Sequence, residues 1–278
     1  MSKVVLITGA TSGMGELTSK LLSDNGYIVY AGTRDKNTIS NDGLLKSIYI
    51  DVTKTESINN AVEKIIKDEG KIDVLVNNAG YGLLSTVEDG TDEEMFNQFD
   101  VNVFGLLKVT RAVLPYMREA KAGVIINISS FLGKMGLPLL AHYNASKYAV
   151  EGIVDSLRFE TLPYNVRVHS IQAGLFGTNF VKKGLVVNSK TTDENSPYKD
   201  LVAHFVPIVA KAINEGPSSQ PIADAVKNII EDENSEIFIP VGDEAKTFIP
   251  LRKELSDKAF EQKVRDTFSI YYSTDKIQ

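Results

Sequence analysis

The sequence contains no cysteine and only three histidines among its 278 residues. The lack of cysteine excludes disulfides, thiolate catalysis and cysteine-ligated metal. It is also compatible with a reducing compartment, so we expect a cytoplasmic protein. The histidines, His142, His169 and His204, have neither the i, i+4 spacing nor the neighbouring carboxylates of a metal site. We therefore expect no metal ion.

An excess of positive charge and long apolar runs are also missing. With 30 lysines and arginines against 36 aspartates and glutamates, the formal net charge is -6, whereas nucleic-acid binding normally needs clustered basic residues. No run reaches the roughly 18 apolar residues of a membrane span. The chain passes from Lys3 directly into a short apolar run, a pattern unlike a secretory leader. We expect no nucleic-acid partner and no membrane span.

Short β-branched apolar runs alternate with helical patterns, and no linker, repeat or low-complexity tract interrupts them, which favours one domain over residues 1–278. The expected strands are 4–8, 27–32, 47–50, 72–76, 124–128, 166–171 and 236–239, and the expected helices are 15–23, 55–68, 91–120, 141–161 and 221–231. Because the apolar runs are continuous, both sheet faces should be covered. We predict an α/β fold, a doubly wound parallel sheet of about seven strands with helices on both faces.

Residues 173–220 break this alternation. A connection of that length inside a compact domain is usually functional, so we predict a substrate-binding loop there. Its apolar stretch 201–209 either lines an apolar pocket or packs on the core or on a second subunit. A C-terminal extension of about residues 240–278 follows the last expected strand.

A glycine-rich turn follows the first expected strand and leads into a helix. Gly9 lets the chain turn off the strand, Gly13 allows backbone to approach a pyrophosphate, and Gly15 permits close packing of helix on sheet. The helix N-terminus would add unpaired N–H groups and positive dipole. The alternative is a tight turn without a ligand, but the place of the motif between strand and helix favours a dinucleotide site.

The end of the second expected strand distinguishes the two nicotinamide dinucleotides. An NAD enzyme usually has a carboxylate there, whereas this chain has Thr33 followed by Arg34, whose guanidinium can bind a 2′-phosphate. NADP(H) is therefore favoured over NAD(H). Asp35 leaves the alternative open, since a small loop shift would bring its carboxylate inward.

Tyr143 and Lys147 are four residues apart in a helical pattern, so they project from the same face. A nearby ammonium stabilises a phenolate and lowers the phenol pKa, which would make Tyr143 usable as an acid–base group. Ser129 and Ser130 follow a strand at the edge where this architecture binds ligands. Asn102 is an unfavourable residue inside a helical pattern, which suggests a hydrogen-bonding role. The alternatives are an ordinary amphipathic face and serines that only cap or turn the chain.

In these motifs the sequence resembles the ordinary single-domain branch of the short-chain dehydrogenase/reductase family. Residues 8–15 fit its TGxxxGxG turn, residues 77–80 read NNAG, and Tyr143 with Lys147 fits YxxxK, in the same order from about Lys3 to Ile239. The resemblance implies a Rossmann fold. One departure is Ala173-Gly174, where the family usually has Pro-Gly, so the rigidity of that loop is in question.

The resemblance also implies residue roles. Ser130 would bind the substrate oxygen, Asn102 would hold a water of the proton relay, and Lys147 would bind the nicotinamide ribose. Asp51 and Val52 would lie near adenine, Asn78 at the adenosine side, and Gly174 and Thr178 at the nicotinamide amide. With the residues of the glycine turn and the second strand, the expected cofactor-binding set is Gly9, Thr11, Ser12, Gly13, Met14, Gly15, Thr33, Arg34, Asp51, Val52, Asn78, Ala79, Gly80, Tyr143, Lys147, Gly174 and Thr178.

From these residues we predict an oxidoreductase that transfers a hydride between NADP(H) and a carbonyl or secondary alcohol, as a reductase of a lipophilic ketone or aldehyde. The resemblance further implies a homodimer or homotetramer formed through the 91–120 and 141–161 helices. Two alternatives are a dinucleotide-sensing regulatory protein without catalysis and a sugar-nucleotide epimerase or dehydratase of the family's extended branch. The presence of the tyrosine and lysine disfavours the first, and the short C-terminal part disfavours the second.

Overall fold

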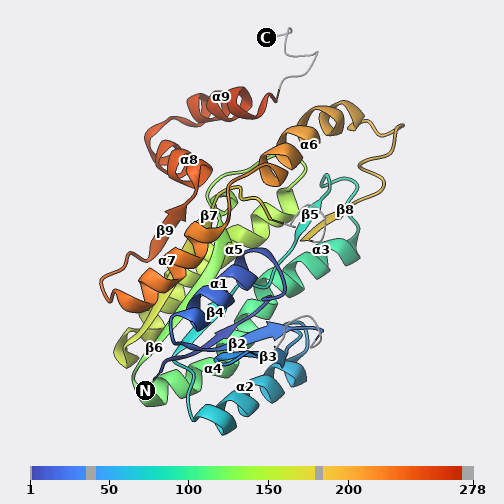
Figure 1. Ribbon diagram of the computed structural model, residues 1–278. Coiled ribbons are helices and arrows are strands. Elements are labelled where there is room, and N and C mark those ends of the chain that lie inside the picture. The colour runs from blue at the N-terminus through green and yellow to red at the C-terminus, as the bar shows by residue number, and fades with distance from the viewer. Residues whose placement is uncertain (1, 36–41, 179–183, 271–278) are drawn as a thin grey trace.

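The computed structural model describes residues 2–35, 42–178 and 184–270. Within these ranges, seven parallel strands form one sheet in the order β3-β2-β1-β4-β6-β7-β9, and Figure 1 shows its twist. The strands are β1 (Val4–Ile7), β2 (Ile28–Thr33), β3 (Leu45–Tyr49), β4 (Val74–Asn77), β6 (Gly123–Ser130), β7 (Val166–Ala173) and β9 (Phe238–Val241). The predicted doubly wound sheet is confirmed.

The helices that the structure describes are α1 (Gly13–Asp24), α2 (Thr55–Glu69), α3 (Asp92–Phe99), α4 (Leu106–Ala120), α5 (Ala141–Thr161), α6 (Lys199–Asn214), α7 (Gln220–Glu231), α8 (Asp243–Glu254) and α9 (Asp257–Phe268). Side chains from α2, α4 and α5 pack on one sheet face, and those from α1 and α7 pack on the other. In β1, Val4 and Leu6 face the first layer, whereas Val5 and Ile7 face the second. Burial on both faces explains why the strand is apolar at every position.

The helix expected over residues 91–120 is confirmed in extent, because residues 92–120 are helical without a break, but it is not α-helical throughout. Thr91 and Glu94 form a capping box that begins α3, but a π-helical turn at Asp100–Gly105 separates α3 from α4. Asn102 lies in this turn, where its side chain exchanges two hydrogen bonds with the backbone of Tyr81. The widened turn thus places a polar side chain for a tertiary contact, which a helical sequence pattern does not reveal.

The connection 173–220 contains more structure than a loop. Strand β8 (Leu185–Val187) pairs with β5 (Gly82–Leu84) in a two-stranded parallel sheet within the described residues, and α6 follows it. Pro207 lies inside α6 and removes a backbone donor, which hid the helix from sequence reasoning. Residues 179–183 of the connection and 271–278 of the extension lie outside the described residues.

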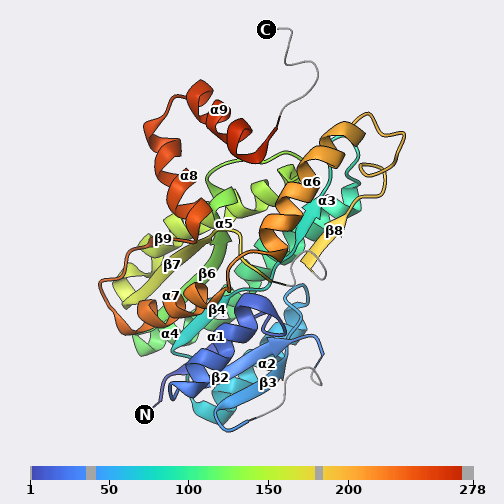
Figure 2. The ribbon, with the colours of Figure 1, turned by 45° about the horizontal axis from the view of Figure 1, so that its top comes forward.

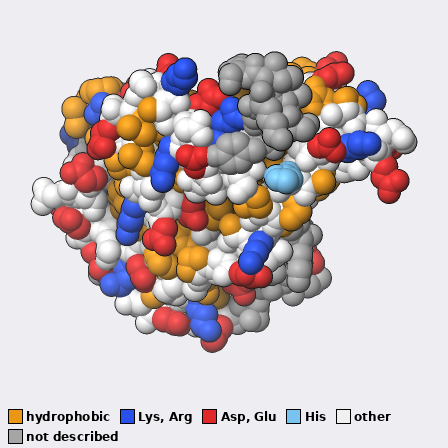
Figure 3. Space-filling model, turned by 90° about the horizontal axis from the view of Figure 1, so that it is seen from above, with side chains coloured by type: hydrophobic (Ala, Val, Ile, Leu, Met, Phe, Trp, Pro, Cys, Tyr) orange, Lys and Arg blue, Asp and Glu red, His pale blue; other side chains and the backbone are white. Residues whose placement is uncertain are grey.

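The C-terminal helices α8 and α9 share a hydrophobic core with α6 and the segment after β6; we call it the C-terminal core. The rings of Phe248 and Phe268 stack with centroids 5.6 Å apart, and Phe205 of α6 lies 6.5 Å from Phe268. Figure 2 shows α8 and α9 next to each other beyond the carboxyl ends of β7 and β9, with α6 across from them, and Figure 3 shows hydrophobic patches among charged side chains on the face seen from above. The extension is therefore part of the folded body.

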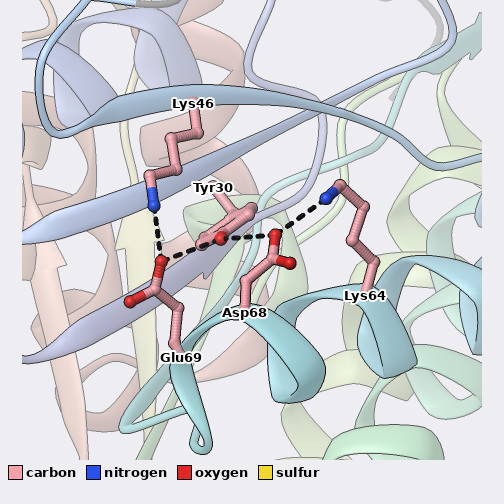
Figure 4. Close-up of polar contacts among 5 residues, drawn as sticks. All are labelled: Tyr30, Lys46, Lys64, Asp68 and Glu69. Carbon is pink, nitrogen blue, oxygen red and sulfur yellow. Dashed lines mark hydrogen bonds and ion pairs between the residues drawn. The ribbon is translucent and has the colours of Figure 1, made fainter.

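A polar network fastens the C-terminal end of α2 to β2 and β3 (Figure 4). The hydroxyl of the fully buried Tyr30 lies 2.9 Å from a Glu69 oxygen and 3.2 Å from an Asp68 oxygen. Lys46 forms an ion pair with Glu69, and Lys64 one with Asp68. This network secures the strand that leads to Thr33 and Arg34. No helix in the described ranges is long and apolar enough to cross a bilayer.

Candidate active site

A cavity of about 760 Å³ lies at the carboxyl ends of the central strands. One part, which we call the polar half, is lined by Gly9, Thr11, Ser12, Gly13, Met14, Thr33, Arg34, Asp51 and Asn78. The other part, the apolar half, is lined by Leu84, Leu132, Leu137, Leu140, Leu175, Leu185, Phe205, Val206 and Val209. The apolar half is formed by the C-terminal core. Position and lining together identify a ligand site.

The glycine turn approaches its neighbours so closely that side chains are excluded. Gly9 has a φ of +67°, and an added Cβ would lie 2.8 Å from the Cα of Ala79. At Gly15 an added Cβ would lie 2.5 Å from the carbonyl oxygen of Gly9. Gly15 does not line the cavity, so its role here is packing, as the sequence predicts. Gly13, with φ +57°, does line it.

Asn78 holds this turn in place. Its side-chain amide donates to the carbonyl oxygens of Thr8 (3.0 Å) and Gly9 (2.8 Å), and the Thr8 hydroxyl accepts from the backbone N–H groups of Asn78 and Ala79. Ser12, the N-cap of α1, makes no side-chain capping bond. The first turn of α1 therefore presents backbone N–H groups toward the cavity, which is the chemistry of a pyrophosphate site.

At the far end of the polar half, the exposed Arg34 lines the cavity and Asp35 does not. The Thr33 hydroxyl accepts a hydrogen bond from the backbone N–H of Asp35 at 2.9 Å, which fixes this corner. Burial raises the pKa of the Asp51 carboxyl, but hydrogen bonds from Thr53 and the positive charges of Arg34 and Lys54 together hold it below its ordinary value. Val52 lies beside Asp51 in the lining.

Ser130, Tyr143 and Lys147 all line the cavity, and Tyr143 packs against the hydrophobic core that forms its apolar half. Burial raises the pKa of the Tyr143 phenol to about 12, and a hydrogen bond with the Ser130 side chain opposes that shift. The Ser130 hydroxyl also accepts from the backbone N–H of Leu132 at 3.1 Å, which orients it. Tyr143 is therefore protonated at neutral pH in this structure, whereas the sequence suggested a phenol pKa lowered by lysine.

Lys147 is 8% exposed, and its ammonium donates to the carbonyl oxygen of Ile128 at 2.9 Å. Burial lowers its pKa to about 8, and the negative charge of Glu151, one helical turn further, opposes this. The Lys147 Nζ lies 5.7 Å from the centroid of the Tyr143 ring. Burial is the largest cause of the pKa shift of both Tyr143 and Lys147, because a site without water disfavours the charged form of each side chain.

Asn102 lies behind this centre and does not line the cavity. Its amide nitrogen donates to the Tyr81 carbonyl (2.9 Å) and to the Ser146 hydroxyl (3.1 Å), and its oxygen accepts from the Tyr81 N–H (3.0 Å). An added Cβ on Gly80 would lie 3.2 Å from that oxygen and 3.9 Å from the Lys147 Nζ. The NNAG segment thus approaches both Asn102 and Lys147.

The segment after β7 reaches the cavity through Ala173, Leu175, Phe176 and Thr178. Gly174 does not line the cavity and instead donates its N–H to the Val241 carbonyl at 2.8 Å. Sequence reasoning missed most residues of the apolar half, because α6 and the turn after β6 reach the site only through tertiary packing. The apolar stretch 201–209 was the one sequence feature that pointed to this half of the cavity. Its residues Phe205, Val206 and Val209 line the cavity and also pack on the core.

A model of the short chain dehydrogenase family matches residues 3–185. The chain belongs to this family. The YxxxK and glycine motifs lie inside the matched range, and most of the connection and the C-terminal helices lie outside it. The protein is thus an oxidoreductase of the short-chain dehydrogenase/reductase type with a nucleotide-binding Rossmann fold.

Relatives and solved structures agree with this assignment. The chain is 39% identical over 240 residues to a 3-ketodihydrosphingosine reductase of Bacteroides thetaiotaomicron, covering 86% of this chain and 88% of the relative. A short-chain dehydrogenase from Streptomyces avermitilis superposes with a TM-score of 0.83 at 27% identity, covering 98% and 99% of the two chains. One from Burkholderia cenocepacia, in complex with NADP, gives 0.72 at 26% identity over 96% and 97%.

Proposed function

We propose that this oxidoreductase uses NADPH to reduce a ketone carried on a long apolar chain, with Tyr143 as the proton donor. The observation that carries the proposal is that Ser130, Tyr143 and Lys147 line one cavity together with the residues of its polar half and those of its apolar half. A carbonyl placed there would accept hydrogen bonds from Ser130 and Tyr143 while its chain lay among leucine and valine side chains.

The polar half fits the cofactor. The N–H groups at the start of α1 suit the pyrophosphate, and Gly9 and Gly13 provide the close approach. Arg34 suits a 2′-phosphate, since a guanidinium binds phosphate oxygens in pairs, and the Asp35 carboxylate does not line the cavity to oppose it. Val52 would contact adenine, and Lys147 the nicotinamide ribose. When bound, the dinucleotide supplies the hydride to the carbonyl carbon.

The residues of the chain handle the proton. Tyr143 holds its proton at neutral pH and gives it to the oxygen as negative charge develops there: the phenol O–H bond breaks and the alcohol O–H bond forms. Ser130 donates a hydrogen bond that stabilises the same charge. The Lys147 ammonium then stabilises the phenolate that remains. The reverse sequence oxidises an alcohol.

The apolar half supports a lipophilic substrate. Among the described lining residues, the ionisable ones are Arg34, Asp51, Tyr81, Tyr143 and Lys147, and none of them belongs to the apolar half. The Bacteroides relative is named for 3-ketodihydrosphingosine, which combines a ketone with a long alkyl chain. A 3-keto sphingoid base or a similar long-chain ketone is therefore the substrate class that we propose.

The test is to titrate the protein with NADPH and NADH, then to assay reduction of ketones with increasing alkyl chain length by the loss of nicotinamide absorbance. We expect tighter binding of NADPH, faster turnover of long-chain ketones, and loss of about three orders of magnitude or more in kcat for Tyr143→Phe. Arg34→Ala should weaken NADPH binding about tenfold or more and leave NADH binding unchanged. Stronger binding of NADH, or a Tyr143→Phe variant with normal turnover, would contradict the proposal.

We also propose that the chain forms a homodimer or homotetramer through α4 and α5. Their outer surface carries Leu107 at 41% exposure, Phe159 at 59% and, directly after α5, Leu162 at 72%. Large exposed apolar side chains on adjacent helices are typical of subunit contacts. Light scattering at micromolar concentration should give a mass of two or four chains, and Phe159→Glu should reduce it; a monomeric wild-type protein would contradict this.

A further inference from the structure

Two contacts from the C-terminal extension hold the backbone immediately after β7. The Gly174 N–H donates to the carbonyl oxygen of Val241, the last residue of β9, at 2.8 Å. The Leu175 N–H donates to the Glu244 carboxylate, in the first turn of α8, at 2.9 Å. Figures 1 and 2 show β9 and α8 beside the end of β7. Both partners lie beyond residues 3–185, the range matched by the family model.

Gly174 and Glu244 fit each other sterically. An added Cβ on Gly174 would lie 2.7 Å from the same Glu244 oxygen that accepts from Leu175, and 3.4 Å from the Val241 carbonyl oxygen. Gly174 is not among the glycines with positive φ, so its conformation is open to any residue. A side chain at this position would displace the carboxylate from the place where it accepts the hydrogen bond of Leu175.

The residues held by this contact face the cavity. Ala173, Leu175, Phe176 and Thr178 line it beside the Ser130–Tyr143 centre, and Phe176 is buried at 3% exposure. Ala173 is held in the sheet by its pairing with Ser130 of β6 and Val241 of β9, whereas the residues after it leave the sheet and depend on other contacts for a fixed position. A shift at Leu175 would move the lining residues on either side of it.

The charge of Glu244 suits this role. A carboxylate that accepts from a backbone N–H makes a shorter and stronger hydrogen bond than a neutral acceptor does. The first turn of α8 also stabilises negative charge, because the positive end of the helix dipole lies there. Glu244 is only partly exposed, which limits competition from water.

We propose that Glu244 is a positioning residue that fixes residues 173–178 against the reactive end of the bound dinucleotide, so that α8 completes the cofactor site. The inference rests on the proposed function, because the cofactor would occupy this cavity. It also takes from the family resemblance the place of Gly174 and Thr178 at the nicotinamide amide. Glu244 itself touches neither cofactor nor substrate; it acts through the backbone of Leu175 and through the space beside Gly174.

The first experiment compares Glu244→Ala, Glu244→Gln and the control Asp243→Ala, which removes a carboxylate from the same helical turn without touching Leu175. The readouts are the NADPH dissociation constant by fluorescence titration and the primary deuterium isotope effect with 4-deuterated NADPH. We expect Glu244→Ala to weaken NADPH binding about tenfold, with a larger isotope effect. Glu244→Gln keeps an acceptor oxygen and should stay within about threefold of wild type, and Asp243→Ala should match wild type. A Glu244→Ala protein that melts at lower temperature but binds NADPH normally overturns the proposal.

The second experiment uses the steric match. Gly174→Ala alone should weaken NADPH binding, whereas the same change in the Glu244→Ala background should add little, because the atom that it would strike is gone. Equal losses in both backgrounds refute the coupling, and this comparison stays informative if one single variant folds poorly. Failure of the proposed function is separate: a wild-type protein that binds NADPH but reduces no ketone leaves the positioning role intact, and one that binds no dinucleotide removes both.

Discussion

Replacing Lys147 with methionine should make the protein more stable at neutral pH while removing its activity. Burial lowers the lysine pKa from 10.5 to about 8 in the folded protein. At about 1.4 kcal/mol per pH unit, the buried ammonium destabilises the fold by roughly 3 kcal/mol at pH 7. Methionine has a similar length and no charge, but it leaves the Ile128 carbonyl without its 2.9 Å partner, a loss of about 1 kcal/mol. The expected net gain is about 2 kcal/mol.

The direction in which the stability difference changes with pH follows from the two pKa values of the lysine. The lysine pKa is lower in the folded than in the unfolded chain, so below pH 8 both states carry the charge and the folded state bears the full burial penalty. Between pH 8 and the unfolded value of 10.5 the folded lysine has lost its proton while the unfolded one keeps it, so the wild type gains stability as pH rises. The advantage of Lys147→Met should therefore shrink across that window.

Urea unfolding without cofactor at pH 7, 8, 9 and 10 measures this directly, with Lys20→Met on the exposed surface of α1 as the control. The control should show no pH-dependent difference from wild type. A Lys147→Met protein that is less stable than wild type at pH 7, or a difference that stays constant from pH 7 to pH 10, would refute the reasoning.

Three further changes test other parts of the site. Gly15→Ala places a Cβ 2.5 Å from the Gly9 carbonyl, so it should destabilise the fold by roughly 1–3 kcal/mol and weaken NADPH binding in a titration; Gly152→Ala, which has open space, should be neutral or stabilising. Glu151→Gln removes the charge that raises the Lys147 pKa, so the alkaline limb of the kcat/KM profile should move to lower pH; an unmoved limb contradicts this. Phe268→Ala removes the ring behind Phe205, so thermal unfolding should show a loss of roughly 3 kcal/mol, and the preferred ketone chain should lengthen in a chain-length series; an unchanged preference would mean that the ring is only structural.

The parts of the fold that could be predicted from the sequence are those that depend on residues close together in the chain. Strand β1 is apolar at each position because both of its faces are buried, and the glycine turn follows it where the chain must bend sharply. The YxxxK spacing placed Tyr143 and Lys147 on one helix face. These features can be recognised in short stretches of sequence, because the repeats of strands and helices and the length of a turn span only a few residues.

The parts that it missed depend on residues far apart in the chain. The π-helical turn places Asn102 where its side chain can bond the backbone of Tyr81, about twenty residues earlier in the chain. Strand β8 pairs with β5, which lies about a hundred residues before it. The spacing of Tyr143 and Lys147 suggested a lowered phenol pKa, but burial raises it, and burial depends on the packing of residues that are distant in the sequence. Glu244 could not be matched to Leu175 from sequence, since nothing local to α8 points to the loop after β7.

The C-terminal core has a consequence for how this enzyme could change its selectivity. The glycine turn is braced by the sheet and by Asn78. The wall of the apolar half is instead formed by side chains of α6, β5, β8 and the segments after β6 and β7, which share a hydrophobic core with α8 and α9. Substitutions among these aromatic and aliphatic side chains could reshape the chamber for a new lipid while leaving nucleotide recognition untouched. Glu244 limits that freedom, because this residue of α8 also holds the backbone of Leu175, which lines the cavity.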